Sequence, residues 1–156
     1  MRDAGPRTGP LGALMDELER AAGELRALIG SLTDEEFEAV RDPEAPDEFR
    51  SIQSVVHHVV RAGTGHANYV RLAFSMEGAP AGGSPGTRTE SAERLQAMVA
   101  YWEATLEGRW EMTDEEIEAI RIESGWGVVY NLEQMFEHAI VHILRHRRQI
   151  ERFLRV

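Results

Sequence analysis

The sequence contains no cysteine and no lysine, and each absence excludes a class of chemistry. Without cysteine there is no thiol nucleophile, no disulfide, and no zinc or iron–sulfur site with cysteine ligands. Without lysine there is no Schiff-base chemistry. The reactive side chains that remain are histidine, the carboxylates, serine, threonine and tyrosine.

Positive charge and long apolar runs are also scarce. Arginine supplies all 17 basic residues, against 27 acidic residues, and the formal net charge is -10. This balance argues against a nucleic-acid-binding protein. No stretch approaches the roughly 18 apolar residues of a membrane span, and residues 1–10 lack the apolar segment of a signal peptide. We therefore expect a cytoplasmic protein that binds neither nucleic acid nor a membrane.

The length of 156 residues and the 42% hydrophobic content fit one globular domain over residues 1–156, with an irregular or disordered N-terminus over residues 1–9. Glycine and proline in residues 77–89 indicate a flexible crossover loop. No segment shows the alternation of a β-strand, so the expected fold class is all-α. Apolar residues at spacings of three and four predict four long helices, over about residues 10–31, 51–76, 90–110 and 131–154.

A short repeat relates the two halves of the chain. TDEEFEAVR at residues 33–41 returns as TDEEIEAIR at residues 113–121, an offset of 80. Each copy begins with a capping box and predicts a short helix, although capping boxes can also recur by chance. We predict two pseudo-repeated helical hairpins in a four-helix bundle of up-down-down-up order, in which the crossover loop lets the second and third long helices run parallel. The same offset relates three further pairs: Ser51 and Asn131, His58 and His138, and His66 and His146.

All six histidines fall in the second and fourth predicted helices. His142 and His146 are four residues apart on the apolar face, so their imidazoles lie one turn apart and can bind one metal ion. In the predicted bundle His58 lies at a similar height, and the sequence therefore predicts a metal site of His58, His142 and His146. His66 and His138 form the mirror pair, with alanine in place of the third ligand, and we interpret them as vestigial or structural.

Three neutral imidazoles leave a coordination position open for water or substrate, as in catalytic metal sites. The alternative is that these histidines are ordinary core or surface residues. His57 points away from His58 and is interpreted as solvent-facing or capping. The HExxH motif is absent and no glutamate stands three residues before a histidine, so neither a zincin nor a di-iron carboxylate bundle is supported.

Two segments of the chain resemble the DinB/YfiT-like family of metal-binding four-helix bundles. They are SIQSVVHHVV, early in the second long helix, and EHAIVHILRHRRQIERFL, in the last. The family pattern has one histidine in the first segment and H-x3-H followed by Arg and Gln in the second. The resemblance places the ligands on His58, His142 and His146, and it implies a divalent ion such as Zn²⁺ or Ni²⁺ and a homodimer.

The resemblance also implies an activity. Relatives include thiol-dependent S-transferases, an isomerase and proteins described only as hydrolases, so we expect a three-histidine metal to activate a low-molecular-weight thiol or water against an electrophilic small-molecule substrate. Arg147 is a candidate for binding an anionic group and Gln149 for orienting a metal-bound water or holding a ligand. A solvated basic face and a purely structural glutamine are the respective alternatives. A protein of another class, a non-catalytic, metal-stabilised homodimeric binding or stress-response protein, stays open.

Overall fold

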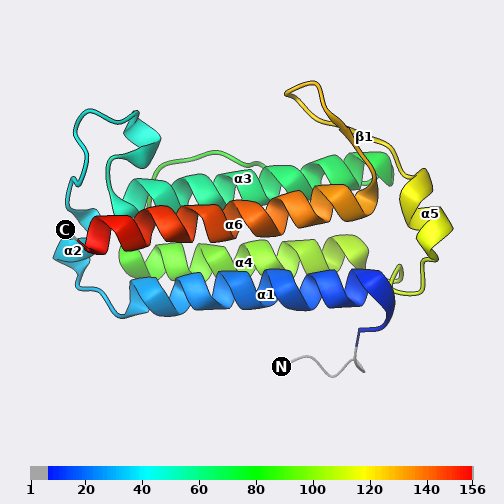
Figure 1. The fold of residues 1–156 in the computed structure, drawn as a ribbon, viewed down its shortest axis with the longest axis horizontal. Coiled ribbons are helices and arrows are strands. Elements are labelled where there is room, and N and C mark those ends of the chain that lie inside the picture. The colour runs from blue at the N-terminus through cyan, green and yellow to red at the C-terminus, as the bar shows by residue number, and fades with distance from the viewer. Residues whose placement is uncertain (1–6, 156) are drawn as a thin grey trace.

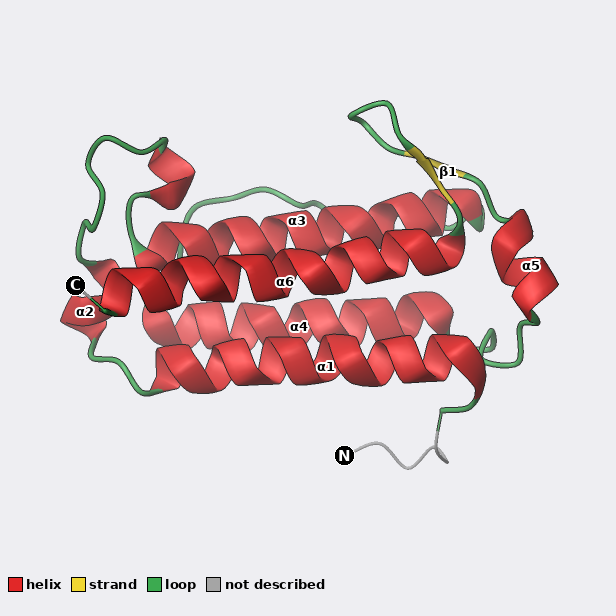
Figure 2. Cartoon of the chain, in the orientation of Figure 1, coloured by secondary structure: helices red, strands yellow, loops and turns green. Residues whose placement is uncertain are grey.

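The computed structural model describes residues 7–155, in which four long helices lie side by side (Figure 1). Short elements occupy the connections at both ends, and helices dominate the chain (Figure 2), which confirms the all-α class. The long helices are α1 (Gly9–Gly30), α3 (Ile52–Ala73), α4 (Arg88–Leu106) and α6 (Leu132–Leu154). The short elements are α2 (Asp34–Glu38), the 3-10 helix η1 (Asp47–Phe49), α5 (Asp114–Ala119), β1 (Ile122–Glu123) and β2 (Val129–Tyr130).

The long helices pack as a closed set of four neighbours. Helix α1 packs against α4 and α6, and helix α3 packs against the same two helices. Helices α1 and α3 therefore lie diagonally opposite each other in the bundle. In Figure 1 the colours show α3 and α4 running in one direction and α1 and α6 in the other, and the connection over residues 74–87 runs back along the bundle. No helix within residues 7–155 combines the length and the apolar content needed to cross a membrane.

Polar side chains at the helix starts explain where α3, α4 and α6 begin. Each starts with a complete capping box, in which the N-cap side chain accepts from the backbone three residues on: Ser51 for α3, Thr87 for α4 and Asn131 for α6. The Thr87 box starts α4 two residues before the predicted position. The helix ends at Leu106 rather than near residue 110, because Glu107 is extended and Gly108 has a φ of 78°. Likewise α3 ends at Ala73 rather than near Met76, before Ser75 in the left-handed region at φ 56°.

The sequence predicts an irregular segment over residues 1–9. Residues 1–6 of this segment lie outside the described residues, and α1 already begins at Gly9. Two short strands are present, although no segment of the sequence shows strand alternation. Strands β1 and β2 pair in antiparallel fashion as a short hairpin. Each strand has two residues, which is too short to show a period of two in the sequence.

The core is continuous through the bundle and brings α3 and α4 into close contact. Trp102 of α4 is fully buried, and its Nε1 donates a hydrogen bond to the Gly63 carbonyl oxygen at 3.0 Å. A Cβ added at Gly63 would lie 2.0 Å from the sulfur of Met98. The glycine therefore permits the close approach of these helices, whereas nothing lies within 4 Å of a Cβ at Gly65.

The sequence repeat has a structural counterpart. Thr33 and Thr113 both form complete capping boxes, and they start the short helices α2 and α5. Their equivalent apolar residues Phe37 and Ile117 are both buried. In each half, residues 39–50 or 120–130 then project from one side of the bundle before the next long helix begins (Figure 1). The repeat thus builds two equivalent projections at opposite ends of α3 and α6.

Candidate metal centre

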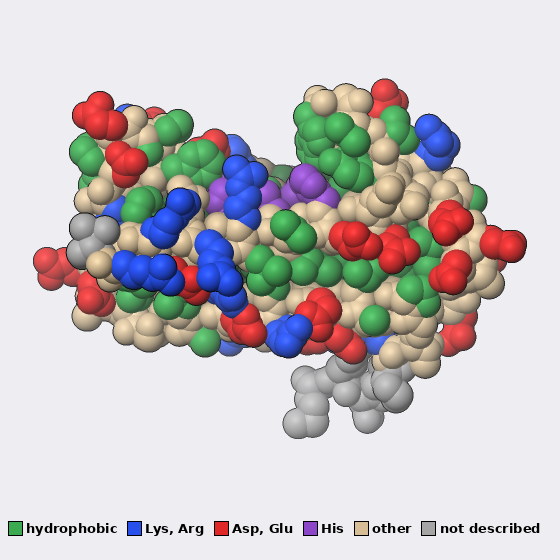
Figure 3. Space-filling view, viewed as in Figure 1, with side chains coloured by type: hydrophobic (Ala, Val, Ile, Leu, Met, Phe, Trp, Pro, Cys, Tyr) green, Lys and Arg blue, Asp and Glu red, His purple; other side chains and the backbone are tan. Residues whose placement is uncertain are grey.

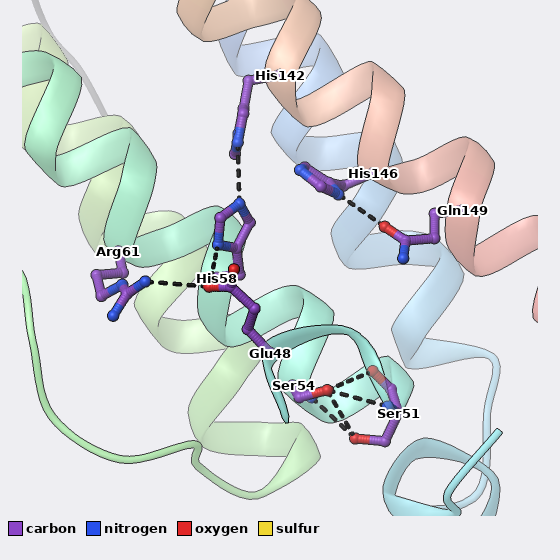
Figure 4. A network of polar contacts seen from close by, with 8 residues as sticks. All are labelled: Glu48, Ser51, Ser54, His58, Arg61, His142, His146 and Gln149. Atoms are coloured by element: carbon purple, nitrogen blue, oxygen red, sulfur yellow. Dashed lines mark hydrogen bonds and ion pairs between the residues drawn. The ribbon is translucent and has the colours of Figure 1, made fainter. Parts of the chain in front are cut away.

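Helices α3 and α6 bring together the three histidines that the sequence predicted as ligands (Figure 4). His58 extends from the second turn of α3, and His142 and His146 extend from successive turns of α6. One ring nitrogen from each lies within 4.8 Å of the other two. Among residues 7–155, these three histidines are the side chains whose potential ligand atoms lie close enough together to bind one metal ion. The group contains no carboxylate.

The spacing of the ring nitrogens fits a small divalent ion. The Nε2 atoms of His58 and His142 are 3.1 Å apart. Two imidazole nitrogens bound to one zinc ion at about 2.0–2.1 Å in tetrahedral geometry are roughly 3.4 Å apart. The donor set is all nitrogen, which suits zinc, nickel, copper or iron better than magnesium or calcium. The three histidines could therefore hold a divalent metal ion.

Two polar side chains fix the orientation of the candidate ligands. The Nδ1 of His58 lies 3.1 Å from Oε2 of Glu48, and the Nδ1 of His146 lies 2.8 Å from Oε1 of Gln149 (Figure 4). Because a carboxylate and an amide oxygen only accept hydrogen bonds, both Nδ1 atoms carry the proton. The lone pair of each ring is then on Nε2, the atom that a metal would bind.

Burial keeps the candidate ligands neutral. It lowers the pKa of His142 to about 3, with further lowering by its three histidine neighbours and by His138. Burial also lowers the pKa of His58, and the nearby Glu48 carboxylate offsets only part of this effect. The pKa of His146 is lowered in the same way. At neutral pH each ring therefore has a lone pair available without first losing a proton.

The mirror pair of histidines is also in contact. The ring centroids of His66 and His138 are 4.9 Å apart, close to the 4.8 Å between the equivalent pair His146 and His58. Burial, with the charge of neighbouring histidines, lowers the pKa of His66 to about 4. Its Nδ1 is buried and has no hydrogen-bond partner among the described residues. The interpretation of His66 and His138 as a vestigial or structural pair stays a prediction.

The histidines form the floor of a hollow between the two projections. Figure 3 shows histidine side chains at the surface there, with apolar side chains on both projections. On one side Phe49 packs edge-on against His58 at 5.0 Å and stacks on His146 at 5.6 Å. On the other side Trp126, 48% exposed, stacks on His138 at 5.2 Å. The open side of the candidate metal centre thus faces a groove with aromatic walls.

Other residues singled out in the sequence occupy different surroundings. The guanidinium of Arg147 pairs with Glu24 on α1 and lies 3.4 Å from Glu151, so the structure does not bring it to the three histidines. Arg145 lies close enough for its charge to lower the pKa values of His58 and His146. His57 is half-buried and lines a cavity under the crossover loop.

Sequence reasoning did not find three residues of this site, namely Glu48, Phe49 and Trp126. All three lie in the projections, where no helical period or capping motif marks a side chain for the site. The sequence offered one indirect signal for these residues, namely the repeat. Glu48 and Phe49 lie just before the N-cap of α3, and the corresponding segment of the second half, just before the N-cap of α6, contains the hairpin with Trp126.

Comparison with known proteins agrees with the sequence resemblance. The sequence profile described as the DinB superfamily matches residues 17–150, which is most of the chain. The matched segment includes all six histidines, Glu48 and Gln149. A search of curated proteins finds no match.

Proposed function

This chain belongs to the DinB superfamily, and on that premise we propose that it is a metal-dependent enzyme that activates a small thiol or water against an electrophilic small molecule. The observation that carries the proposal is the three-histidine group, with no further protein ligand among residues 7–155, on the floor of an open groove. A site with three protein ligands and access from solvent is the arrangement of catalytic rather than structural metals.

The side chains around the group support this function. Glu48 and Gln149 hold the Nδ1 protons of His58 and His146, so that two Nε2 lone pairs are directed toward one point. Phe49 covers the rings of both and limits the access of water from that side. A divalent ion such as Zn²⁺ or Ni²⁺ held by these rings would supply Lewis acidity, which lowers the pKa of a bound thiol or water.

Gln149 contacts a candidate metal ligand, whereas Arg147 does not, so the proposal gives them different roles. Gln149 is assigned to positioning His146, because the two side chains are 2.8 Å apart. Arg147 pairs with Glu24, and contact with a substrate anion would require it to leave that partner. We therefore assign the electrostatic influence on the open groove to Arg145 instead, whose charge reaches three histidines.

The proposal includes the finer features that the family suggests: an up-down-down-up bundle built as one domain from two repeated hairpins, a homodimer and a cytoplasmic location. The helix directions in Figure 1 and the twin capping boxes at Thr33 and Thr113 support the first of these. The dimer and the location stay predictions.

The test is a reaction screen with protein loaded with Zn²⁺ or Ni²⁺. Small thiols are offered with electrophiles such as an activated aromatic halide or an epoxide, and loss of the free thiol is followed; ester and amide hydrolysis is followed in parallel without thiol. The proposal predicts turnover in one arm that is lost in His142→Ala. Full metal loading without turnover in either arm would favour the non-catalytic, metal-stabilised alternative.

A further inference from the structure

A second cavity lies on the other side of α3 from the candidate metal centre. It has a volume of about 280 Å³ and lies between α3, the crossover loop and α4. This volume is near the lower limit for pockets that hold small molecules. Its polar lining comes mainly from His57, Arg61, Thr64, Gly83, Ser84 and Arg94.

The lining is basic in a chain of formal charge -10. Two arginines and one histidine line the cavity, and none of its described lining residues is a carboxylate. His57 and Arg61 are one turn apart on α3, and Arg94 approaches from α4. All three side chains line the same cavity, so they lie near one another. Two guanidinium groups and a histidine that line one cavity favour an anionic occupant, although one of the guanidinium groups, that of Arg61, also pairs with Glu48.

The crossover loop supplies a frame for such an occupant. Arg94 donates one hydrogen bond from Nη1 to the carbonyl oxygen of Ser84 at 2.8 Å, which ties the loop to α4. An arginine has five N–H donors, so further donors of Arg94 stay free for a ligand. Gly83, at φ 98°, has open space on its Cβ side, and this lets a ligand approach the loop backbone.

We propose that this cavity, framed by His57, Arg61 and Arg94, binds a small molecule through an oxyanion group such as a phosphate or sulfate. Guanidinium groups match the oxygens of these anions with paired hydrogen bonds. The cavity is larger than a bare oxyanion requires, so the favoured occupant carries a short substituent on that group. This site is separate from the three-histidine group and does not depend on the proposed reaction.

The two sites are nevertheless connected by one chain of contacts. Arg61 donates to Oε2 of Glu48 at 3.2 Å, and the same oxygen lies 3.1 Å from Nδ1 of His58 (Figure 4). Arg61 uses one of its N–H donors on Glu48, so an oxyanion held by its other donors would share the guanidinium with the carboxylate that orients a metal ligand. We therefore expect occupation of one site to change the affinity of the other.

The first test is a titration of the full chain with inorganic phosphate and with glycerol 3-phosphate, followed by amide NMR and calorimetry. We expect saturable binding, with shifts concentrated at Gly83, Arg94 and their neighbours. Tighter binding of the monoester identifies a substituted ligand, and equal binding identifies the free ion; both support an oxyanion site. Absence of saturable binding of either anion overturns the proposal. The titration is repeated with His142→Ala, in which binding must persist, because binding lost with the metal ligand would assign the anion to the metal centre.

Two charge-removing variants give the matched comparison. Arg94→Gln should weaken binding about tenfold or more, since it removes a charge-assisted contact. Arg88→Gln removes the same charge from the same helix, but its guanidinium pairs with Asp34 and does not line the cavity, so binding should stay within about twofold. Arg94→Gln also removes the hydrogen bond that ties the loop to α4, so a loss of binding in this variant could have two causes. Arg61→Gln leaves the bond between Arg94 and Ser84 in place and should weaken binding to a similar degree. Equal effects of Arg88→Gln and Arg94→Gln would reduce the result to general charge attraction and contradict the proposal.

Discussion

The Nε2 atoms of His58 and His142 face each other at 3.1 Å, although 84 residues separate them in the chain. The first is directed by Glu48, and the second is on the helix ridge that also carries His146. Burial of both rings costs free energy, because desolvation disfavours polar groups that lose their water contacts. A divalent ion held between the rings would offset this cost, and the three-histidine group could hold such an ion.

Glu48 should control metal affinity without binding the metal. Glu48→Gln removes the carboxylate that fixes the ring of His58, and loss of such a partner weakens metal binding by about 10–100-fold. Competition with a chromophoric chelator measures the change. Glu44→Gln is the matched control, because Glu44 is exposed in the same projection. Equal affinities of the Glu48 and Glu44 variants would show that the contact has no such role.

Gln149 should act through His146 in the same way. Gln149→Leu removes the acceptor of the Nδ1 proton, which allows the ring to turn and to expose the wrong nitrogen to the metal. We expect about a tenfold loss of metal affinity, and partial recovery in Gln149→Glu, which restores an acceptor. Failure of the glutamate to recover affinity would indicate that the glutamine acts by packing.

The metal-free protein should lose stability as the pH falls. Burial lowers the pKa of His66 to about 4 from an ordinary value of 6.5, so between these values the unfolded chain binds a proton that the folded chain does not. Stability is therefore full above pH 6.5 and decreases toward pH 4, by at most about 1.4 kcal/mol per pH unit for this residue.

The check is urea unfolding in the presence of chelator at about pH 7.5 and about pH 5. His66→Leu, which cannot be protonated, should lose less stability over this interval than the natural sequence. His142, whose pKa burial lowers to about 3, contributes in the same direction in both proteins. Equal losses in the two proteins would mean that His66 is protonated as easily in the folded chain as in the unfolded one.

Two glycines of α3 provide a paired test of the packing. Gly63→Ala forces the buried side chain of Met98 to move and should destabilise the fold by about 1–3 kcal/mol. Gly65→Ala meets nothing within 4 Å and should stabilise the helix by about 0.5–1 kcal/mol. Denaturant midpoints measure both, and effects of the same sign would contradict the described contact between α3 and α4.

Local patterns in the sequence predicted the helices well, because the physical causes of a helix are local. The apolar spacing located α1, α3, α4 and α6, and Ser51 and Asn131 marked two of the starts. Errors of two to four residues at the ends of α3 and α4 arose where single residues decide: the Thr87 cap, Ser75 and Gly108.

The candidate site was predictable only in part, for the same reason. The three histidines lie on regular helices, so their spacing and the repeat indicate a shared face. Glu48, Phe49 and Trp126 reach the site through projections whose paths depend on tertiary contacts, such as the bond from the Gly125 backbone to the Tyr69 hydroxyl at 2.7 Å. Arg147 follows the ligand His146 directly in the sequence but does not reach the site. Adjacent residues of a helix point about 100° apart, so its side chain is directed toward Glu24 on α1.

The most direct test of the account is the metal content of the purified, tag-free protein, measured by mass spectrometry after Zn²⁺ or Ni²⁺ has been offered and excess ion removed. The account predicts about one ion per chain, with three histidine nitrogens as ligands, and loss of the ion in His142→Ala but not in His57→Ala. A chain that retains no ion under these conditions, or a His142→Ala variant that retains as much as the natural sequence, would contradict the assignment of His58, His142 and His146 as a metal centre.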